Sequence, residues 1–220
     1  MYQFNLRAIL VYFDRLPQSI AVTLALTAVA VVASTLLAFP IAKARMSGIP
    51  PLVVLARAYV ELFRNIPILV LLYVYYFGLA QAGLHLSTWW AALLALSTNA
   101  AAYCAEILRA GYSAIPGGQR EAARSLGLRA WQIEVFVVLP QVARVIIPPF
   151  ANHCIGVLLG SSIAAVIGVA DLADWMLATG SDSFRYMESF LVAATIYIVL
   201  CQGVAAVIAA IDRRARAGLR

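Results

Sequence analysis

A run of uncharged residues between Arg15 and Lys43 constrains this chain more than any other feature. Most residues in the run are apolar or small. It is longer than the roughly 20 apolar residues with which a helix crosses the ~30 Å hydrocarbon core of a bilayer. Because charges inside a bilayer are costly, a charge-free run of this length indicates a lipid environment. We therefore expect a membrane-spanning helix over about residues 17–42.

Four further apolar stretches extend this interpretation to the whole chain. Their ranges are about 66–84, about 87–108, a stretch within 135–169 and about 190–211. The first of them follows an amphipathic stretch, 52–64, and in the third we expect Pro140, Pro148 and Pro149 to interrupt the helix. Hydrophobic residues make up 64% of the chain and charged residues 12%, against about half and about a quarter in a soluble domain. The sequence thus predicts an all-α membrane protein with five transmembrane helices.

Basic residues are distributed unevenly between the loops of this arrangement. Positively charged residues near helix ends favour the cytoplasmic side of the membrane. The poorer set of loops holds Arg7, Arg15 and Arg185, and the richer set holds Lys43, Arg45, Arg57, Arg64, Arg120, Arg124, Arg129 and the arginine-rich C-terminal tail. We therefore expect the N-terminus outside and the C-terminus in the cytoplasm. The net charge of +6 is assigned to the cytoplasmic face of the membrane, not to a nucleic-acid partner.

This topology divides the chain into three parts. Residues 1–16 are expected to form an N-terminal interfacial segment, residues 17–212 a transmembrane domain with a cytoplasmic loop at about 111–134, and residues 213–220 a basic cytoplasmic tail. One interpretation of the first eighteen residues is a helix that lies on the outer membrane surface. Its apolar face would consist of Tyr2, Phe4, Leu6, Ile9, Leu10 and Phe13.

The long cytoplasmic loop contains a spaced pattern. Residues 119–127 read Gln-Arg-Glu-Ala-Ala-Arg-Ser-Leu-Gly, and residues 137–140 read Val-Val-Leu-Pro. The residues from Glu121 to Leu126 favour a helix, and Gly127 suits its end. Pro116 and two glycines precede it. Such a helix is too short and too polar to cross the membrane, and its central alanines let a second surface approach closely. Docking on a partner is the interpretation we favour over an ordinary connecting helix.

The whole pattern resembles the signature loop of the permease subunits of bacterial ABC importers. Further segments are similar to the polar amino-acid permeases, the histidine, glutamine and glutamate group. These segments are Glu61-Leu-Phe-Arg-Asn-Ile-Pro67, Ala102-Tyr-Cys-Ala-Glu-Ile-Leu-Arg-Ala-Gly111, Ile115-Pro-Gly-Gly-Gln119, Leu139-Pro-Gln, Pro148, Asn152 and Ile167-Gly-Val. The resemblance covers about residues 17–212.

That resemblance implies a type I ABC importer permease fold in a bacterial inner membrane. It implies that Glu121, Ala122, Ala123 and Gly127 couple the chain to an ATPase. The partners it implies are a dimer of ABC ATPase subunits, a second permease chain that is identical or related, and an extracytoplasmic solute-binding protein, besides membrane lipid. The implied function is the import of a polar amino acid, and another small polar solute is the alternative.

ATP is expected to bind elsewhere. A phosphate-binding loop needs a glycine-rich segment that ends in Gly-Lys followed by Ser or Thr, and the only lysine, Lys43, has no glycine before it. We therefore expect a transporter subunit that is not itself an enzyme and holds no cofactor, with ATP and magnesium on the partner ATPase. No metal site is expected either, because Cys104, Cys154 and Cys201 lack the spacing of metal ligands.

Polar residues inside the expected spans are candidates for the substrate pathway. Glu106 and Arg109 are three residues apart on one helix face, and Asn99 and Tyr103 are four apart. Structural ion pairs and hydrogen bonds between helices are the alternative roles, and the spacing of Glu61 and Arg64 allows a similar pair.

A further candidate is the segment 159–162, Leu-Gly-Ser-Ser, which is expected to interrupt the fourth span and to offer the hydroxyls of Ser161 and Ser162. Many related permeases carry Lys or Gln, then Asp, Thr and Ser there. Because the strongly polar pair is missing, the partner permease is an alternative holder of the solute.

Two other functional classes fit less well. An ion-coupled carrier or channel needs no coupling loop, and its usual mid-membrane acid or histidine is represented here by His153 alone, which we interpret as a packing residue. An intramembrane hydrolase would use Ser161 or Ser162 with His153, but nothing in the sequence supplies a third orienting group. The sequence leaves open the identity of the amino acid and the choice between homodimer and heterodimer.

Overall fold

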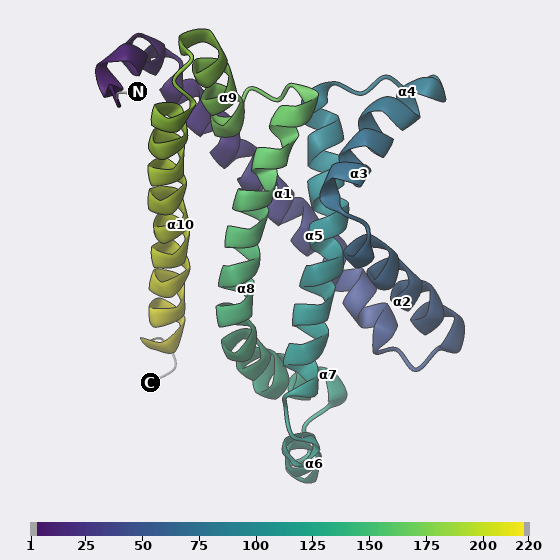
Figure 1. The fold of residues 1–220 in the computed structure, drawn as a ribbon. Helices are drawn as coiled ribbons and strands as arrows, with labels where there is room; N and C mark the ends of the chain where they lie inside the picture. Colours follow the sequence, from purple (N-terminus) through teal and green to yellow (C-terminus); the bar gives the residue numbers. More distant parts are fainter. Residues whose placement is uncertain (1–3, 218–220) are drawn as a thin grey trace.

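The computed structural model describes residues 4–217, and the side chains of residues 4–214. All regular elements in this part of the chain are helical, without a strand (Figure 1). In chain order they are η1 (Leu6–Asp14), α1 (Leu16–Arg45), α2 (Pro50–Asn65), α3 (Ile68–Tyr73), η2 (Val74–Gly78), α4 (Leu79–Gln81), α5 (Thr88–Ser113), α6 (Gly117–Ser125), α7 (Ala130–Gln132), η3 (Ile133–Val138), α8 (Leu139–Ser161), η4 (Ser162–Ile167), α9 (Leu172–Ser183) and α10 (Tyr186–Ala217).

Four continuous helical segments of the described chain are long and apolar enough to cross a membrane. They are Leu16–Arg45, Thr88–Ser113, Ala130–Ile167 and Tyr186–Arg214. A bent pair, Pro50–Asn65 with Ile68–Gln81, raises the number to five if it is one span. The predicted all-α membrane fold is confirmed. The end of α10 and α6 lie toward one end of the molecule and the N-terminal part at the other (Figure 1), while the side that faces the cytoplasm stays a prediction, as does the division into three parts.

The second span differs from a simple crossing helix. The chain turns by 101° between α2 and the helical segment Ile68–Gln81. Ile66 is extended (φ −84°, ψ 124°), because a residue before proline avoids the α conformation and Pro67 follows. The segment after the bend includes the π-helical stretch η2 and, at 1.5 Å per residue, reaches about 21 Å, less than the bilayer core.

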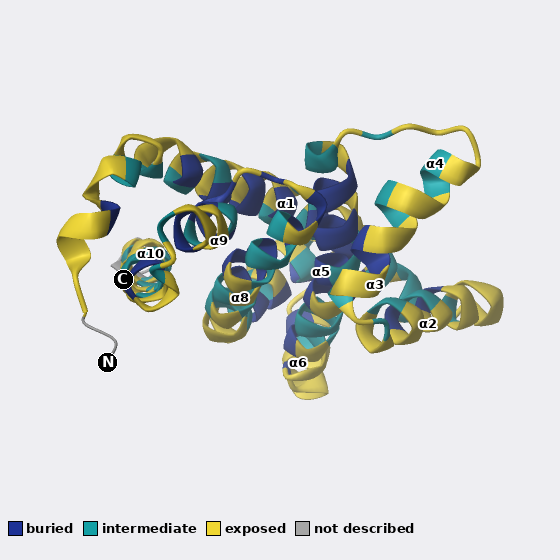
Figure 2. Ribbon diagram, turned by 45° about the horizontal axis from the view of Figure 1, so that its top comes forward, coloured by how far each residue is buried: buried dark blue, intermediate teal, exposed yellow. Residues whose placement is uncertain are grey.

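Small residues let α5 serve as the central helix. It packs against α1 along one side and α8 along the other, and Figure 2 shows it as the most deeply buried part of the bundle. Its buried face is formed largely by small side chains: Ala91, Ala92, Ala95, Ala100, Ala101, Ala102, Cys104, Ala105 and Gly111. Small side chains allow helix backbones to approach closely. Close packing matters in a bilayer because there is little hydrophobic driving force between helices there.

The prolines of the fourth span do not break it, so the predicted interruption at these residues is wrong. Pro140 lies where the π-helical stretch η3 (Ile133–Val138) passes into α8, and Pro148 and Pro149 lie inside a helix that continues to Ser161. Neighbouring helices help membrane helices to tolerate proline. The helix does change at the predicted segment 159–162: α8 gives way to the 3-10 helix η4, which ends at the left-handed Gly168 (φ 86°).

The helix α9 was not predicted from the sequence, which gave no element between 169 and 190. Its start is fixed by Asp171, whose carboxylate accepts hydrogen bonds from the backbone N–H groups of Ala173 at 3.0 Å and Asp174 at 2.9 Å. An aspartate at this position is a strong helix start signal. At the other end of α9 the corner to α10 is tight, because a Cβ at Gly180 would lie 2.4 Å from Tyr186 Cδ1.

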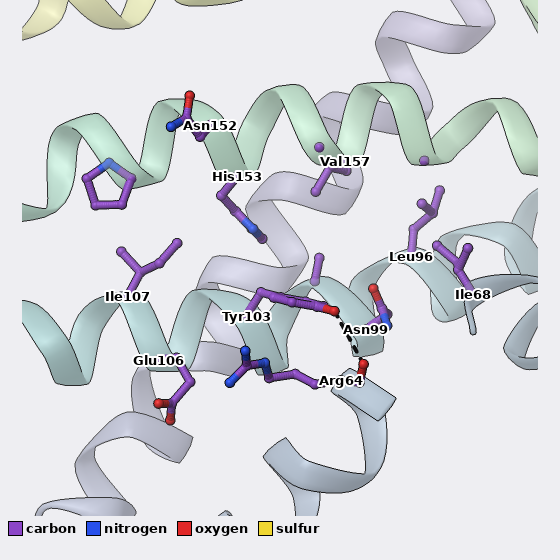
Figure 3. Close-up of a pocket in the computed structure, with 14 residues that line it drawn as sticks. Arg64, Ile68, Leu96, Asn99, Tyr103, Glu106, Ile107, Asn152, His153 and Val157 are labelled. Atoms are coloured by element: carbon purple, nitrogen blue, oxygen red, sulfur yellow. Dashed lines mark hydrogen bonds between the residues drawn. The ribbon is translucent and has the colours of Figure 1, made fainter. Parts of the chain in front are cut away.

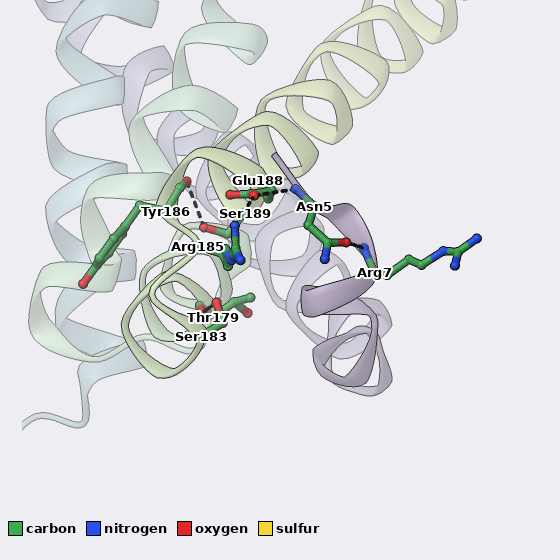
Figure 4. A network of polar contacts seen from close by, with 8 residues as sticks. All are labelled: Asn5, Arg7, Thr179, Ser183, Arg185, Tyr186, Glu188 and Ser189. Atoms are coloured by element: carbon green, nitrogen blue, oxygen red, sulfur yellow. Dashed lines mark hydrogen bonds and ion pairs between the residues drawn. The ribbon is translucent and has the colours of Figure 1, made fainter. Parts of the chain in front are cut away.

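The N-terminal segment folds against this corner. η1 buries Ile9 completely, and Phe13 lies edge-on to Trp175 with 5.8 Å between ring centroids. At its start, the Asn5 N–H donates to the buried Glu188 carboxylate at 2.8 Å (Figure 4). The predicted apolar face is thus partly used in packing, although Leu6 and Leu10 are exposed. Tyr2 lies outside the described residues, and a place on the membrane surface stays a prediction.

Candidate functional site

Polar side chains of α5 hold the bent end of α2. The last carbonyl groups of a helix have no partner within it. Asn99 donates from Nδ2 to the carbonyl oxygen of Phe63 at 2.7 Å, and the Tyr103 hydroxyl donates to that of Arg64 at 3.3 Å. Asn99 and Tyr103 do share a face of α5, as their spacing indicates. In this conformation their donors bind backbone carbonyl groups, which is the alternative role of hydrogen bonding between helices.

The same two residues line a cavity of about 520 Å³ between α5, α8 and the α2–α3 bend (Figure 3). The other lining residues are Arg64, Ile68, Leu96, Ala100, Glu106, Ile107, Pro149, Asn152, His153, Gly156, Val157 and Gly160. The wall is therefore mostly apolar with a few polar groups, as is usual for small-molecule sites. Of the sequence-predicted pathway residues, the structure places Asn99, Tyr103 and Glu106 in this wall.

Two arginines neutralise the Glu106 carboxylate. Arg109 Nη2 lies 3.0 Å from Glu106 Oε2, and Arg45 from the end of α1 forms a second ion pair with it. The predicted Glu106–Arg109 pair is present, whereas the contact with Arg45 joins distant parts of the chain and could not be read from spacing. Such pairing removes most of the cost of keeping charges near the membrane interior.

Arg64 has a different environment. Its guanidinium carbon lies 5.1 Å from the centre of the Tyr103 ring, within the range of a cation–π contact. Among the described residues it forms no ion pair, so the Glu61–Arg64 pair that the spacing allows is not made.

His153 points from α8 toward α5 and lines the cavity (Figure 3). Its Nε2 is buried and has no hydrogen-bond partner among the residues that the structure describes. Its ring lies beside Phe150, with 5.9 Å between centroids. Sequence reasoning interpreted His153 as a packing residue. The missed signal is its spacing: His153 lies one helix turn from Gly156 and two from Gly160, and so shares a helix face with these two residues of the cavity wall.

Ser161 and Ser162 are placed differently. The Ser161 hydroxyl, fully buried, donates to the Leu158 carbonyl at 2.8 Å, and the Ser162 hydroxyl donates to the Leu159 carbonyl at 2.6 Å. Neither belongs to the cavity wall, whereas the adjacent Gly160 does. Their hydroxyls satisfy backbone groups near the end of α8, and a role in the pathway stays a prediction.

The second candidate region is the loop around α6, which projects from the end of the molecule (Figure 1). Ala123 is buried against Ile115 and Val142, and Arg120 pairs with Glu134 at 3.5 Å. These contacts fix the helix on η3 and α8. Glu121 and Ala122 remain exposed on its outer side.

Gly127 ends α6 as the sequence predicts. It adopts a left-handed conformation (φ 78°), and its N–H donates to the Arg124 carbonyl at 2.9 Å, while the Leu128 N–H donates to that of Ala123 at 3.2 Å. This is the usual glycine-dependent helix stop. At this turn the side chain of Leu126 points outward and is 82% exposed. The sequence analysis did not single out this residue. Within the described residues there is no cluster of three or more side chains suited to a metal ion.

Comparison with known proteins identifies the family. The model of the family described as "Binding-protein-dependent transport system inner membrane component" matches residues 34–217, well over half of the chain. The chain belongs to this family. The permease is therefore an inner-membrane component of a transport system.

Individual relatives agree with this assignment over most of their length. The permease is 38% identical over 200 residues to the probable amino-acid ABC transporter permease protein YckA of Bacillus subtilis (strain 168), covering 91% of this chain and 88% of that one. It is 35% identical to the arginine transport system permease protein ArtQ of Bacillus subtilis (strain 168), covering 83% and 84%.

Solved structures agree as well. The crystal structure of an amino acid ABC transporter with histidines matches with a TM-score of 0.89 and 35% identity, covering 97% of this chain and all of that one. An inward-facing structure of the MetNI methionine ABC transporter matches with a TM-score of 0.76 and 22% identity, which supports the fold alone.

Proposed function

We propose that the permease is the membrane-spanning subunit of an ABC importer that carries a polar amino acid into the cytoplasm. The observation that carries this proposal is a single chain in which an intramembrane cavity and an exposed short helix lie on the same pair of helices, α5 and α8. The cavity offers a place for a small polar solute. The helix offers a surface through which a partner can move α5 and α8. Relatives named as amino-acid permeases support the substrate class.

The proposed coupling surface consists of Glu121, Ala122, Ala123 and Gly127, with the addition of Leu126. Ala123 anchors α6 to the bundle, and Glu121 and Ala122 face outward. Leu126 adds an exposed apolar side chain beside them, whose burial against a partner would stabilise the complex. Movement of this surface would pass to α8 through η3, against which α6 packs.

In this proposal ATP and magnesium bind to a pair of separate ATPase subunits, because the single lysine, Lys43, stands in no phosphate-binding loop. A second permease chain, identical or related, would complete the pathway. An extracytoplasmic solute-binding protein would deliver the amino acid. The proposed pathway residues are Asn99, Tyr103, Glu106, Arg109, Ser161 and Ser162, of which the first three are supported by their place in the cavity wall.

The test compares a charge reversal and an added bulky side chain on α6 with a charge reversal at the other end of the molecule. Glu121→Lys and Ala122→Trp alter the outer side of α6, and Asp14→Lys makes the same kind of reversal on an exposed residue of η1. The first two are expected to reduce co-purification with the ATPase and amino-acid uptake into proteoliposomes, whereas Asp14→Lys leaves co-purification intact. Normal complex formation and uptake with both α6 variants would refute the coupling surface.

A further inference from the structure

We propose that the cavity selects amino acids with acidic or neutral side chains over cationic ones, and that Arg64 and His153 hold the solute's carboxylate. This inference rests on the proposed function and adds a substrate class to it. It starts from the charges in the cavity wall.

The wall presents more free positive charge than negative charge. Among the described residues that line the cavity, Glu106 carries the one carboxylate, and Arg45 and Arg109 already pair with it. A lysine-like or arginine-like side chain entering the cavity would therefore have to displace an ion pair before it found an anion. In surroundings of low polarity such an uncompensated cation is strongly disfavoured.

Arg64 supplies the opposite preference. Its guanidinium lines the cavity, lies over the Tyr103 ring and has no carboxylate partner among the described side chains. A guanidinium has five N–H donors in a plane and matches a carboxylate with two parallel hydrogen bonds. The contact with Tyr103 orients the group without using those donors. Arg64 is thus a positioned cation that lacks an anion.

His153 supplies a second donor from the opposite helix. Its Nε2 is buried, has no partner within the described part of the chain, and belongs to a side chain that points into the cavity (Figure 3). Because buried polar atoms are normally hydrogen-bonded, an atom left unpaired in a cavity wall marks a place for a ligand group. With its proton on Nε2, the imidazole donates to a carboxylate oxygen.

The ammonium group of the solute also has a partner in the wall. Asn99 uses Nδ2 to bind the Phe63 carbonyl, and this leaves its amide oxygen as an acceptor. Donors that can bind a carboxylate, on α2 and α8, and an acceptor that can bind an ammonium group, on α5, then line one cavity. An amino acid's backbone groups fit this set, while its side chain lies against the apolar part formed by Ile68, Leu96 and Val157.

The experiment measures equilibrium binding of radiolabelled L-glutamate, L-glutamine and L-arginine to the permease–ATPase complex in lipid nanodiscs, without the solute-binding protein. We expect glutamate or glutamine to bind at least about tenfold more tightly than arginine. Arg64→Gln should weaken binding of the preferred amino acid roughly 10- to 100-fold, the range for a lost charge-assisted pair. The binding of arginine should not become weaker. His153→Gln should give a smaller loss of roughly 3- to 10-fold.

Two further variants keep the result interpretable. Arg64→Lys retains the charge but not the planar fork, and should recover part of the affinity. Arg57→Gln removes an exposed arginine from the same helix, away from the cavity, and should change nothing. The proposal is overturned if arginine binds as tightly as glutamate and glutamine, if none of the three binds, or if Arg64→Gln and Arg64→Lys both bind normally. Amino-acid uptake by the complete importer would survive each of these results, and its absence would instead refute the proposed function.

Discussion

Asn99 on α5 donates from Nδ2 to the carbonyl oxygen of Phe63 at 2.7 Å, two residues before α2 ends. The bond ties the central helix to the 101° bend that separates α2 from α3. Two chain segments that are distant in sequence thereby share one wall of the cavity. The cavity therefore depends on a polar contact as well as on apolar packing.

Replacing Asn99 by leucine should loosen this bend. The substitution keeps the side chain's size but leaves the part-buried Phe63 carbonyl without its donor. We expect a cost of about 1 kcal/mol, at the low end of the range for buried groups. We expect a lower thermal midpoint of the purified complex and slower uptake. Tyr103→Phe is the matched control, because its longer bond of 3.3 Å to the Arg64 carbonyl is worth less and the ring beneath Arg64 is kept. Equal effects of the two variants would contradict the importance given to the Asn99 bond.

A second prediction concerns the contact between α5 and α8. A Cβ added at Gly111 would lie 2.3 Å from Ile146 Cγ2, so alanine here forces the helices apart. Overpacking of this kind typically costs about 1–3 kcal/mol. Gly203→Ala in α10 is the control, since nothing lies within 4 Å of its added Cβ. Thermal unfolding of the solubilised complex should show a lower midpoint for Gly111→Ala and an unchanged or higher midpoint for Gly203→Ala.

The double variant Gly111→Ala, Ile146→Ala sharpens this test. The new methyl group at 111 takes part of the space left by Ile146, so the double variant should be more stable than the sum of the two losses predicts. Strict additivity would mean that the two side chains do not compete for the same space.

The parts of the fold that the sequence could predict depend on local composition. Long uncharged runs mark the spans, and the left-handed Gly127 was expected because a glycine after a helical run commonly ends it. The pair Glu106–Arg109 follows from helical spacing. In each case the feature depends on residues that are close together in the chain.

The features that the sequence could not predict involve distant segments. The Arg45–Glu106 ion pair joins α1 to α5. Pro67 marks a break after α2, but the angle of 101° depends on how α3 packs beside α5. Pro148 and Pro149 were expected to interrupt a helix that in fact continues, because tertiary packing outweighs their local preference. His153 likewise could not be assigned to the cavity until the facing helix was in place.

The end of α6 gives a third prediction. Gly127→Ala places a Cβ in the left-handed region, at a cost of about 1–2 kcal/mol, whereas Gly127→Asn is better tolerated there. We expect the alanine variant to reduce ATP-dependent uptake and ATPase binding more than the asparagine variant does. The physical reason is that a displaced α6 end moves Leu126 and the proposed coupling surface.

Gly83→Ala provides the matched control for backbone strain. Gly83 is also left-handed (φ 88°), with nothing within 4 Å of an added Cβ, and it lies between α4 and α5, away from α6. It should lose a similar amount of stability while ATPase binding stays normal. If Gly83→Ala weakens ATPase binding as much as Gly127→Ala, general destabilisation explains both results.

A fourth prediction concerns the pH dependence of stability at the start of α9. Burial raises the pKa of Asp171 to about 6 from an ordinary 3.8, although hydrogen bonds from the Asp174 and Ala173 N–H groups oppose the shift. The folded state then holds the proton more firmly than the unfolded state. The free energy of unfolding should be highest below about pH 4, fall by about 2–3 kcal/mol as the pH rises toward 6, and level off above that.

Two substitutions at this position separate charge from capping. Asp171→Asn keeps a side-chain oxygen that can cap α9 but carries no charge, so the thermal midpoint should lose its decline between about pH 4 and 6 and exceed that of the unaltered protein at pH 7. Asp171→Ala also removes the charge but loses the cap, so its profile should be flat and lower at every pH. A decline that persists in both variants would assign the pH dependence to another group. Because Asp171 caps α9, which packs against η1, the same measurement tests whether this corner limits the stability of the whole bundle.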